Sequence, residues 1–362
     1  MVLAALLGPA LAAAPLARAD ERPRAATVVA GPEYAAGGLG NLGLGKGYRD
    51  LWTTPITVPV LDMGTFAGGL TPLHRAGRLQ TLCLVLEGED GRQYTFRPLD
   101  KEPERILPVE WRRSFPAKIV HDHTSATYPG AALVLPVLTG ALSLLGTEPR
   151  LVVLPDAPAL GAFRGDFAGK LGTIDVYPQA GPGMPPPFDR ATDVVRSSRM
   201  WKLWLAGPEN AVDARAFLRA RILDLLVGDY DRHSGQWRFV RLDGQSSWEP
   251  LREDPDMVFL KSDGLAFDLI RGRSPRFLKF GPKFPRRLEG LTASAAEMDR
   301  WLLSGLDRAE FEEVARDAQA RLTDGVIDDA IGRVPPEWRE ASRAEIVPAL
   351  RRRDALVPVV LH

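Results

Sequence analysis

Residues 228–237 read Gly-Asp-Tyr-Asp-Arg-His-Ser-Gly-Gln-Trp, and this stretch is the most informative part of the chain. It follows a helical pattern over 212–226, and Gly228 is typical of a helix end. An apolar and aromatic strand pattern and an Asp-Gly turn come next, and a second strand then leads into a second acidic stretch, Glu-Asp-Pro-Asp at 253–256. Because a short hairpin joins the two acidic stretches, we expect Asp231 and Asp256 to face one cleft.

Phosphoryl transfer requires two carboxylates, an amide oxygen and a cation near one another, and the two acidic stretches supply the carboxylates and the amide. One carboxylate orients the attacking hydroxyl, and a second carboxylate with an amide oxygen holds Mg²⁺ on the nucleotide phosphates. Asp231 fits the first role, whereas Asp256 and Gln236 fit the second. A cation from a strand-rich part of the chain would meet the phosphates.

The first acidic stretch also resembles loops of known families. Residues 231–236, Asp-Arg-His-Ser-Gly-Gln, resemble the Asp-Arg-His-x-x-Asn signature of phosphoinositide-kinase-like enzymes. They are more similar still to the Gly-x-x-Asp-Arg-His loop of HipA-type and secretory-pathway casein-kinase-like enzymes. Residues 96–99, Phe-Arg-Pro-Leu, resemble the Phe-Lys-Pro segment that carries the nucleotide lysine of secretory kinases. The resemblance covers roughly residues 55–260 and extends to exported bacterial proteins with a Gly-Asp-Trp-Asp-Arg-His-Glu-Asp-Gln-Trp loop.

Membership of this atypical kinase superfamily implies an α+β, bilobal, protein-kinase-like fold with a small strand-rich N-lobe and a larger, mainly helical C-lobe. It also implies ATP or another nucleotide with Mg²⁺ or Mn²⁺. The residues it assigns are Asp231 as the catalytic residue, Asp256, Gln236 and Asp254 as metal ligands, and Arg97 or Lys101 as the nucleotide-binding cation. The glycine pair Gly68 and Gly69, between two predicted strands, would let backbone amides approach the nucleotide closely, or would simply form a turn.

The sequence departs from the family pattern at several of these positions. Gln236 replaces Asn, which keeps the oxygen ligand on a longer arm. Arg97 stands where a Lys is expected, although Lys101 could substitute for it. Either Asp of the second stretch could bind metal, and we favour Asp256 because an apolar run follows it. Asp122 is the nearest acid that could pair with the cation.

The pattern along the chain predicts the domain organisation. Ile56–Leu61 reads as a strand, and Gly-Glu-Asp-Gly at 88–91 predicts a hairpin turn. The uncharged stretch 130–146 is too short for a membrane span and predicts a buried core helix. We expect a signal peptide (1–19), a flexible leader (20–47), an N-lobe with a core helix (48–150) and a helical C-lobe (151–362).

Several local signals refine the helical half. Asn210 is predicted to cap the helix over 212–226, and Ser294 to open a later helix through a capping box. Asp307 to Leu322 is expected to form another helix. His121 and His123 would share a face if they lay on a strand, but no third ligand is evident for zinc.

Composition and the N-terminus limit the partners. The chain has 46 Lys and Arg and 46 Asp and Glu, so a neutral surface gives no sign of nucleic-acid binding. The single Cys83 excludes an internal disulfide. The uncharged run that ends in Ala17-Arg18-Ala19 predicts export, with cleavage after Ala19, to the periplasm or the outside, and no transmembrane segment thereafter. An envelope or outer-membrane partner is consistent with that.

Three functional interpretations stay open. The first is an exported kinase that phosphorylates a protein, peptidoglycan, lipid or small molecule. The second is a degenerate kinase fold that binds nucleotide or metal, or acts as a cell-envelope interaction module, without turnover. The third is a metal-dependent hydrolase that uses the same carboxylates. The acceptor substrate is not identified by the sequence.

Overall fold

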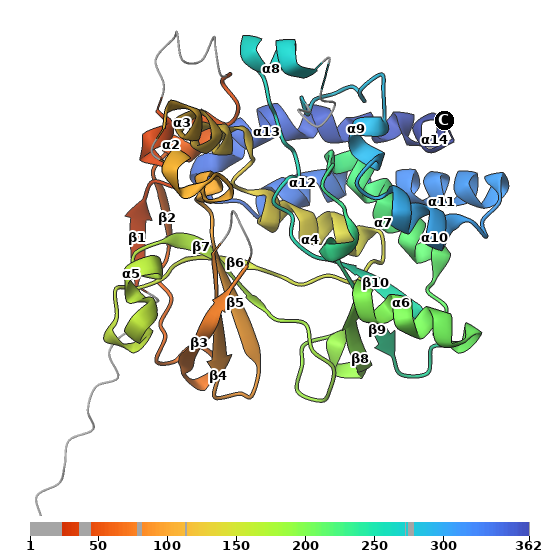
Figure 1. The fold of residues 1–362 in the computed structure, drawn as a ribbon, viewed down its shortest axis with the longest axis horizontal. Coiled ribbons are helices and arrows are strands. Elements are labelled where there is room, and N and C mark those ends of the chain that lie inside the picture. The colour runs from red at the N-terminus through yellow and green to blue at the C-terminus, as the bar shows by residue number, and fades with distance from the viewer. Residues whose placement is uncertain are drawn as a thin grey trace, which may run out of the picture.

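A computed structural model describes residues 24–35, 45–77, 82–112, 114–271, 273 and 279–361. The expected signal peptide lies outside them. The fold is mixed α+β, with the sheets along one side of the molecule and most helices along the other (Figure 1). The strands are β1 (Ala25–Val28), β2 (Ile56–Pro59), β3 (Leu70–Ala76), β4 (Cys83–Gly88), β5 (Gln93–Pro98), β6 (Arg150–Val153), β7 (Leu171–Val176), β8 (Ala191–Arg196), β9 (Trp237–Leu242) and β10 (Trp248–Arg252).

The largest sheet has five antiparallel strands in the order β3-β4-β5-β7-β6. The predicted turn at 88–91 joins β4 to β5 and is confirmed. Alternation along β5 points Tyr94 and Phe96 into a hydrophobic cluster with Leu84 and Ile174, while Thr95 and Arg97 face the opposite side. The sheet thus carries one apolar face and one face with polar side chains.

Two expected boundaries are corrected by the strand pairing. Within the leader expected over 20–47, β1 pairs with β2 from Ala25 to Val28, because Thr27 and Val28 are β-branched residues that fit a strand. The N-lobe boundary expected at residue 150 would divide the five-stranded sheet, since β7 pairs with β5 and β6 pairs with β7. The five-stranded sheet therefore continues to Val176.

A second, three-stranded sheet has the order β10-β9-β8. The predicted hairpin over 237–252 forms its β9 and β10, with Trp237 opposite Arg252. No strand of this sheet pairs with the five-stranded sheet within the described residues. The hairpin therefore places the end of the first acidic stretch, Gln236, beside the start of the second, Glu253.

The helices are α2 (Arg49–Thr53), α3 (Phe115–Asp122), α4 (Ala131–Ala141), α5 (Arg164–Phe167), α6 (Ser197–Ala206), α7 (Ala214–Val227), α8 (Leu265–Arg271), α9 (Glu289–Thr292), α10 (Ala296–Leu303), α11 (Arg308–Arg321), α12 (Asp324–Gly332), α13 (Pro336–Leu350) and α14 (Leu356–Val360). The predicted core helix is α4, which packs against α12 and α7 in the main hydrophobic cluster. None of the helices in the described ranges is long and apolar enough to span a membrane.

The helix ends confirm some predictions and correct others. Gly228 closes α7 in the left-handed conformation, with a φ of 72°, as expected. Asn210 does not cap α7, because Asp213 lies directly before it and accepts from the Ala216 N–H at 2.8 Å. Ser294 forms no capping box and instead donates to the Tyr230 carbonyl. A complete capping box occurs at Asp307, before α11.

Candidate functional site

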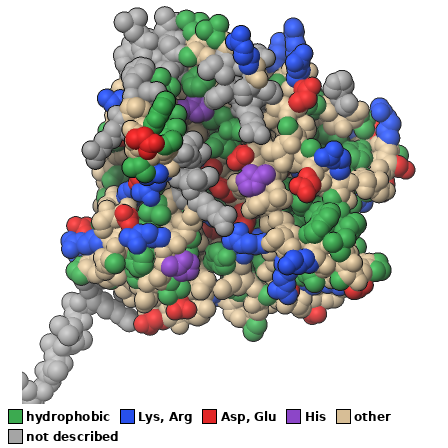
Figure 2. Space-filling model, viewed as in Figure 1, with side chains coloured by type: hydrophobic (Ala, Val, Ile, Leu, Met, Phe, Trp, Pro, Cys, Tyr) green, Lys and Arg blue, Asp and Glu red, His purple; other side chains and the backbone are tan. Residues whose placement is uncertain are grey.

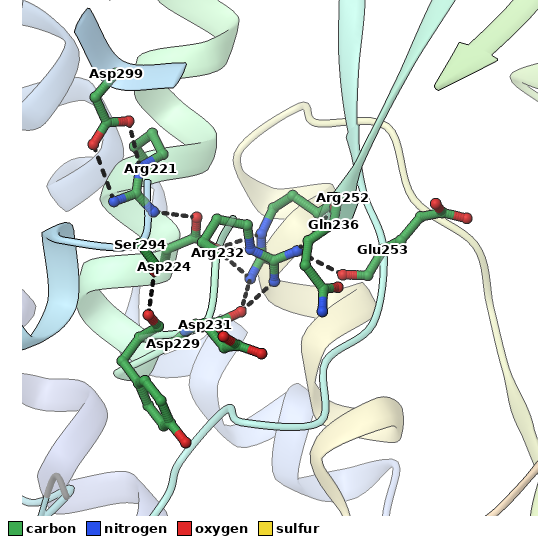
Figure 3. Close-up of polar contacts among 11 residues, drawn as sticks. Arg221, Asp224, Asp229, Asp231, Arg232, Gln236, Arg252, Glu253, Ser294 and Asp299 are labelled. Atoms are coloured by element: carbon green, nitrogen blue, oxygen red, sulfur yellow. Dashed lines mark hydrogen bonds and ion pairs between the residues drawn. The ribbon is translucent and has the colours of Figure 1, made fainter. Parts of the chain in front are cut away.

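The first acidic stretch, residues 229–236, rests on a buried network of ion pairs (Figure 3). Asp224, on the last turns of α7, is fully buried between the guanidinium groups of Arg221 and Arg252, each at 2.6 Å. Arg232 is 1% exposed and pairs with Asp229 as well as with Asp224. Burial raises the pKa of Asp224, but Arg252 and Arg232 outweigh it and hold that pKa below its usual range.

Arg232 also joins the two acidic stretches. Its Nη1 donates to the Glu253 carbonyl at 2.5 Å and to the Gln236 carbonyl at 3.2 Å. The Glu253 N–H donates to the same Gln236 carbonyl at 3.0 Å. Arg232 is therefore a positioning residue whose ion-pair partners are Asp229 and Asp224.

Asp231 and Gln236 lie on one side of this network. In Figure 3 the carboxylate of Asp231 and the amide of Gln236 lie below the Arg232 and Arg252 guanidiniums, on the side away from Asp299. The Asp231 backbone is held by its N–H donating to Asp229 at 3.2 Å and its carbonyl accepting from His233 at 2.8 Å. The two side chains predicted for catalysis and metal binding thus lie on the same side of the network.

Asp254 has the most unusual surroundings in the second acidic stretch. Its φ of 53° is rare for a residue other than glycine, and such backbone strain is concentrated at functional sites. Asp254 Oδ2 accepts from Gln236 Nε2 at 3.4 Å. Asp254 Oδ1 and Gln236 Oε1 are both shielded from solvent and accept no hydrogen bond. Burial, followed by the neighbouring Asp256, raises the pKa of Asp254 from 3.8 to about 6.

Asp256, two residues on, already has a cation. Lys101 Nζ lies 2.7 Å from its Oδ2, and Lys101 is 8% exposed. Burial raises the pKa of Asp256, but Lys101 and Arg97 outweigh it and hold that pKa below its usual value. The ion pair joins the segment after β5 to the second acidic stretch.

Arg97 approaches the same stretch from β5. Its Nη1 lies 3.8 Å from Cys83 Sγ on the neighbouring strand. Burial lowers the pKa of Arg97, but Cys83, Asp254 and Asp256 together raise it overall. Both cations that the sequence singled out therefore lie beside the carboxylates of the second acidic stretch.

A cavity of about 120 Å³ lies between the polar face of the five-stranded sheet and β10. A cavity of about 150 Å³ binds benzene, so this space is somewhat smaller than one that takes a single six-membered ring. Figure 2 shows acidic side chains deep in a hollow near the centre of the face drawn there. The cavity is lined by Thr95, Arg97, Ala132, Leu135, Thr139, Thr173, Asp175, Tyr177, Arg232, Leu251, Glu253 and Asp254, among others.

The predicted glycine pair is not part of this group. Gly68 and Gly69 precede β3 and lie against Glu89, at the turn between β4 and β5. Arg97 lies near Cys83, which pairs with the opposite end of β3. Since β3 has 7 residues, its two ends are about 20 Å apart. The positive φ values of Gly68 and Gly69, 80° and 136°, form a turn remote from the acidic stretches.

Two further expectations are corrected. Asp122 does not pair with Arg97 or Lys101, because Arg49 holds both of its oxygens, at 2.8 and 2.5 Å. His121 and His123 do not share a strand face, since α3 ends between them. His123 Nε2 contacts Ser262 Oγ at 2.8 Å, whereas His121 points towards Glu104.

Sequence reasoning missed the residues that hold the site together. Asp224 and Arg221 lie within the helix predicted over 212–226, and both are buried. Arg252 ends β10 and pairs with Asp224. Their signal was an Arg and an Asp three positions apart on a helix whose other face is apolar, which is a spacing that allows contact.

No family model matches the chain, and no curated protein matches it. Among solved structures, the Helicobacter pylori proinflammatory kinase CtkA aligns with 77% of this chain and 92% of its own, at 10% sequence identity and a TM-score of 0.38. Similarity at this level identifies neither a family nor an activity, so the functional conclusion depends on the residues of the site.

Proposed function

We propose that the chain is a kinase-like phosphotransferase with a bilobal arrangement, and that it binds a nucleotide with a divalent cation between its two larger sheets. The observation that carries the proposal is the pair of solvent-shielded oxygens, Asp254 Oδ1 and Gln236 Oε1, that accept no hydrogen bond. The two side chains contact each other at 3.4 Å, and buried polar atoms are almost always satisfied, so their orphaned oxygens favour an unseen cation. Carboxylate and amide oxygens are the ligands that Mg²⁺ and Mn²⁺ prefer.

Within this proposal Asp254 takes precedence over Asp256 as the main metal ligand. Lys101 already neutralises Asp256 at 2.7 Å. Asp254 has no such partner at Oδ1, and its pKa is raised by burial and by the adjacent carboxylate. A divalent cation would relieve the repulsion between the carboxylates of Asp254 and Asp256.

The nucleotide phosphates would then meet Arg97 and Lys101. In protein kinases the phosphate-binding lysine lies on the third strand of the small sheet. Here β5 is the third strand of the five-stranded sheet in chain order, and it carries Arg97 near its end, with Lys101 three residues beyond it. The base would lie beside Thr95 and Thr173, which line the cavity between the sheets, and this cavity would have to widen to hold it.

Asp231 would act on the acceptor. Its carboxylate would orient the acceptor hydroxyl and take its proton as the oxygen bonds to the γ-phosphorus. The bond from that phosphorus to the leaving diphosphate would break in the same step. When bound, Mg²⁺ would supply charge neutralisation on the phosphate oxygens. Gln236 would orient its amide oxygen towards that ion.

The test is metal-dependent nucleotide binding followed by an assay for transfer. Thermal shift with ADP or ATP should show stabilisation only with Mg²⁺ or Mn²⁺ present, and Asp254→Asn should remove it. Asp243→Asn, on the exposed β9–β10 turn, is the matched control and should bind as the wild type does. Stabilisation by nucleotide that needs no metal, or that survives Asp254→Asn, would refute the proposed site.

A second candidate function, binding without turnover, is favoured by the size of the cavity. At about 120 Å³ it is smaller than the 300 Å³ or more typical of ligand pockets. Arg97 lines it, and Lys101 is engaged with Asp256. Mass spectrometry of acceptors after incubation with ATP separates the two candidates, because only the phosphotransferase transfers phosphate or nucleotide.

A further inference from the structure

A second group of metal-ligand side chains lies outside the cleft. Glu33 belongs to the 3₁₀ turn Pro32–Tyr34, Asp100 follows β5, and His121 lies in the last turn of α3. One potential ligand atom from each of the three lies within 4.8 Å of the other two. In the part of the chain that the structure describes, this is the one group of three or more His, Cys, Asp or Glu residues so arranged.

Glu104 orients the histidine of this group. Its Oε2 lies 3.0 Å from His121 Nδ1, so the proton of a neutral imidazole is favoured on Nδ1. The lone pair of Nε2 then faces Glu33 Oε1, 4.0 Å away, and Tyr34 Oη, 3.3 Å away. A carboxylate on the far nitrogen is the usual arrangement around a metal-binding histidine.

The charge around His121 also favours a cation. Glu33, Asp100 and Glu104 surround one imidazole, and Tyr34 donates to Asp100 Oδ1 at 2.5 Å. Among the described residues no Lys or Arg forms an ion pair with any of these three carboxylates. Even a protonated His121 would leave an excess of negative charge.

We propose that Glu33, Asp100 and His121 bind a divalent transition-metal ion of the Zn²⁺ class, with Glu104 as the residue that orients His121. An imidazole nitrogen with carboxylates favours Zn²⁺ over Mg²⁺ or Ca²⁺, which take oxygen ligands. Zinc ligands at about 2.1 Å in a tetrahedron are about 3.4 Å apart, so atoms that lie within 4.8 Å of one another must approach by up to about 1.4 Å. Glu33 is exposed, on a short turn, and can make that movement. Tyr34 or water would complete the coordination.

The ion would join three separate segments of the chain. It would tie the 3₁₀ turn at Glu33 and the end of α3 to Asp100, whose neighbour in sequence, Lys101, pairs with Asp256. The proposed zinc site shares no ligand residue with the proposed nucleotide site, so each proposal can be tested and rejected independently of the other.

The test is a Zn²⁺ titration of the full chain against a chromophoric chelator, with Glu33→Gln, His121→Gln and Glu104→Gln variants. We expect one Zn²⁺ per chain, at least tenfold weaker binding in Glu33→Gln and His121→Gln, and a loss of about 10–100-fold in Glu104→Gln. His74→Gln, at an exposed histidine of β3, is the matched control and should bind normally. Excess Mg²⁺ should not displace the ion.

Two outcomes would overturn the proposal. Absence of stoichiometric Zn²⁺ binding would leave His121 as an ion-pair partner of Glu33 and Glu104 only. Unchanged binding in Glu33→Gln would assign any bound zinc to other residues. Because Glu33 is exposed, this variant tests the site even if His121→Gln does not fold.

Discussion

Replacing Asp254 by Asn should stabilise the chain when no ligand is bound. Burial and Asp256 raise the pKa of Asp254 from 3.8 to about 6, so the folded state holds a proton that the unfolded state loses between those values. Stability therefore falls as the pH rises through this window. The cost of ionising Asp254 is at most about 3 kcal/mol near pH 7 and about half of that near pH 5. Asn carries no charge and avoids this cost at both values.

The assay is thermal unfolding of wild type and Asp254→Asn across this pH range. About 2 °C per kcal/mol for a chain of this size gives a rise of up to about 6 °C near pH 7 and about 3 °C near pH 5. Adding Mg²⁺ and nucleotide should reverse the order, because only the wild type binds them. A variant that is less stable than the wild type near pH 7, or a difference that does not change with pH, would refute the reasoning.

Other substitutions test separate parts of the site. Asp231→Asn should abolish transfer while nucleotide binding persists, which a binding titration beside a transfer assay would show. Arg232→Met should lower the free energy of unfolding by about 3–5 kcal/mol in denaturant titrations, because it leaves buried carboxylates unpaired. Lys101→Met should raise the pKa of Asp256 and weaken metal-dependent nucleotide binding, which a binding titration would show, because it removes both the partner of Asp256 and a proposed phosphate contact. For export, N-terminal sequencing of protein from its native host should return Asp20, and Met1 would contradict it.

The sequence predicted the elements whose signals are local. The β4–β5 turn, the β9–β10 hairpin and the Gly228 helix end each depend on residues within one short stretch. The proximity of Gln236 to Asp254 was also predictable, because the two strands of that hairpin return the chain to its start. Local signals therefore predict that the two acidic stretches meet at the start of this hairpin.

Elements that depend on distant partners were predicted poorly. Ala25–Val28 forms a strand because it pairs with β2. Asp122 pairs with Arg49 and therefore does not pair with Arg97 or Lys101. Gly68 and Gly69 have the composition of a phosphate-binding turn, but the register of β3 against β4 directs them to the far end of the sheet. Contacts between residues so far apart in the sequence cannot be predicted from composition or periodicity.

The state of the carboxylates distinguishes the supporting network from the proposed site. Beneath the loop, the guanidiniums of Arg221, Arg232 and Arg252 meet the carboxylates of Asp224, Asp229 and Asp299, so three positive charges oppose three negative ones.

At the second acidic stretch Arg97 and Lys101 lie beside Asp254 and Asp256, so two positive charges oppose two negative ones. The network satisfies its own carboxylates, whereas the proposed site has two unsatisfied oxygens and, in Asp254, a carboxyl whose pKa is raised by burial and by Asp256. A divalent cation would satisfy both oxygens, and it would leave a net positive charge of two for nucleotide phosphates to neutralise.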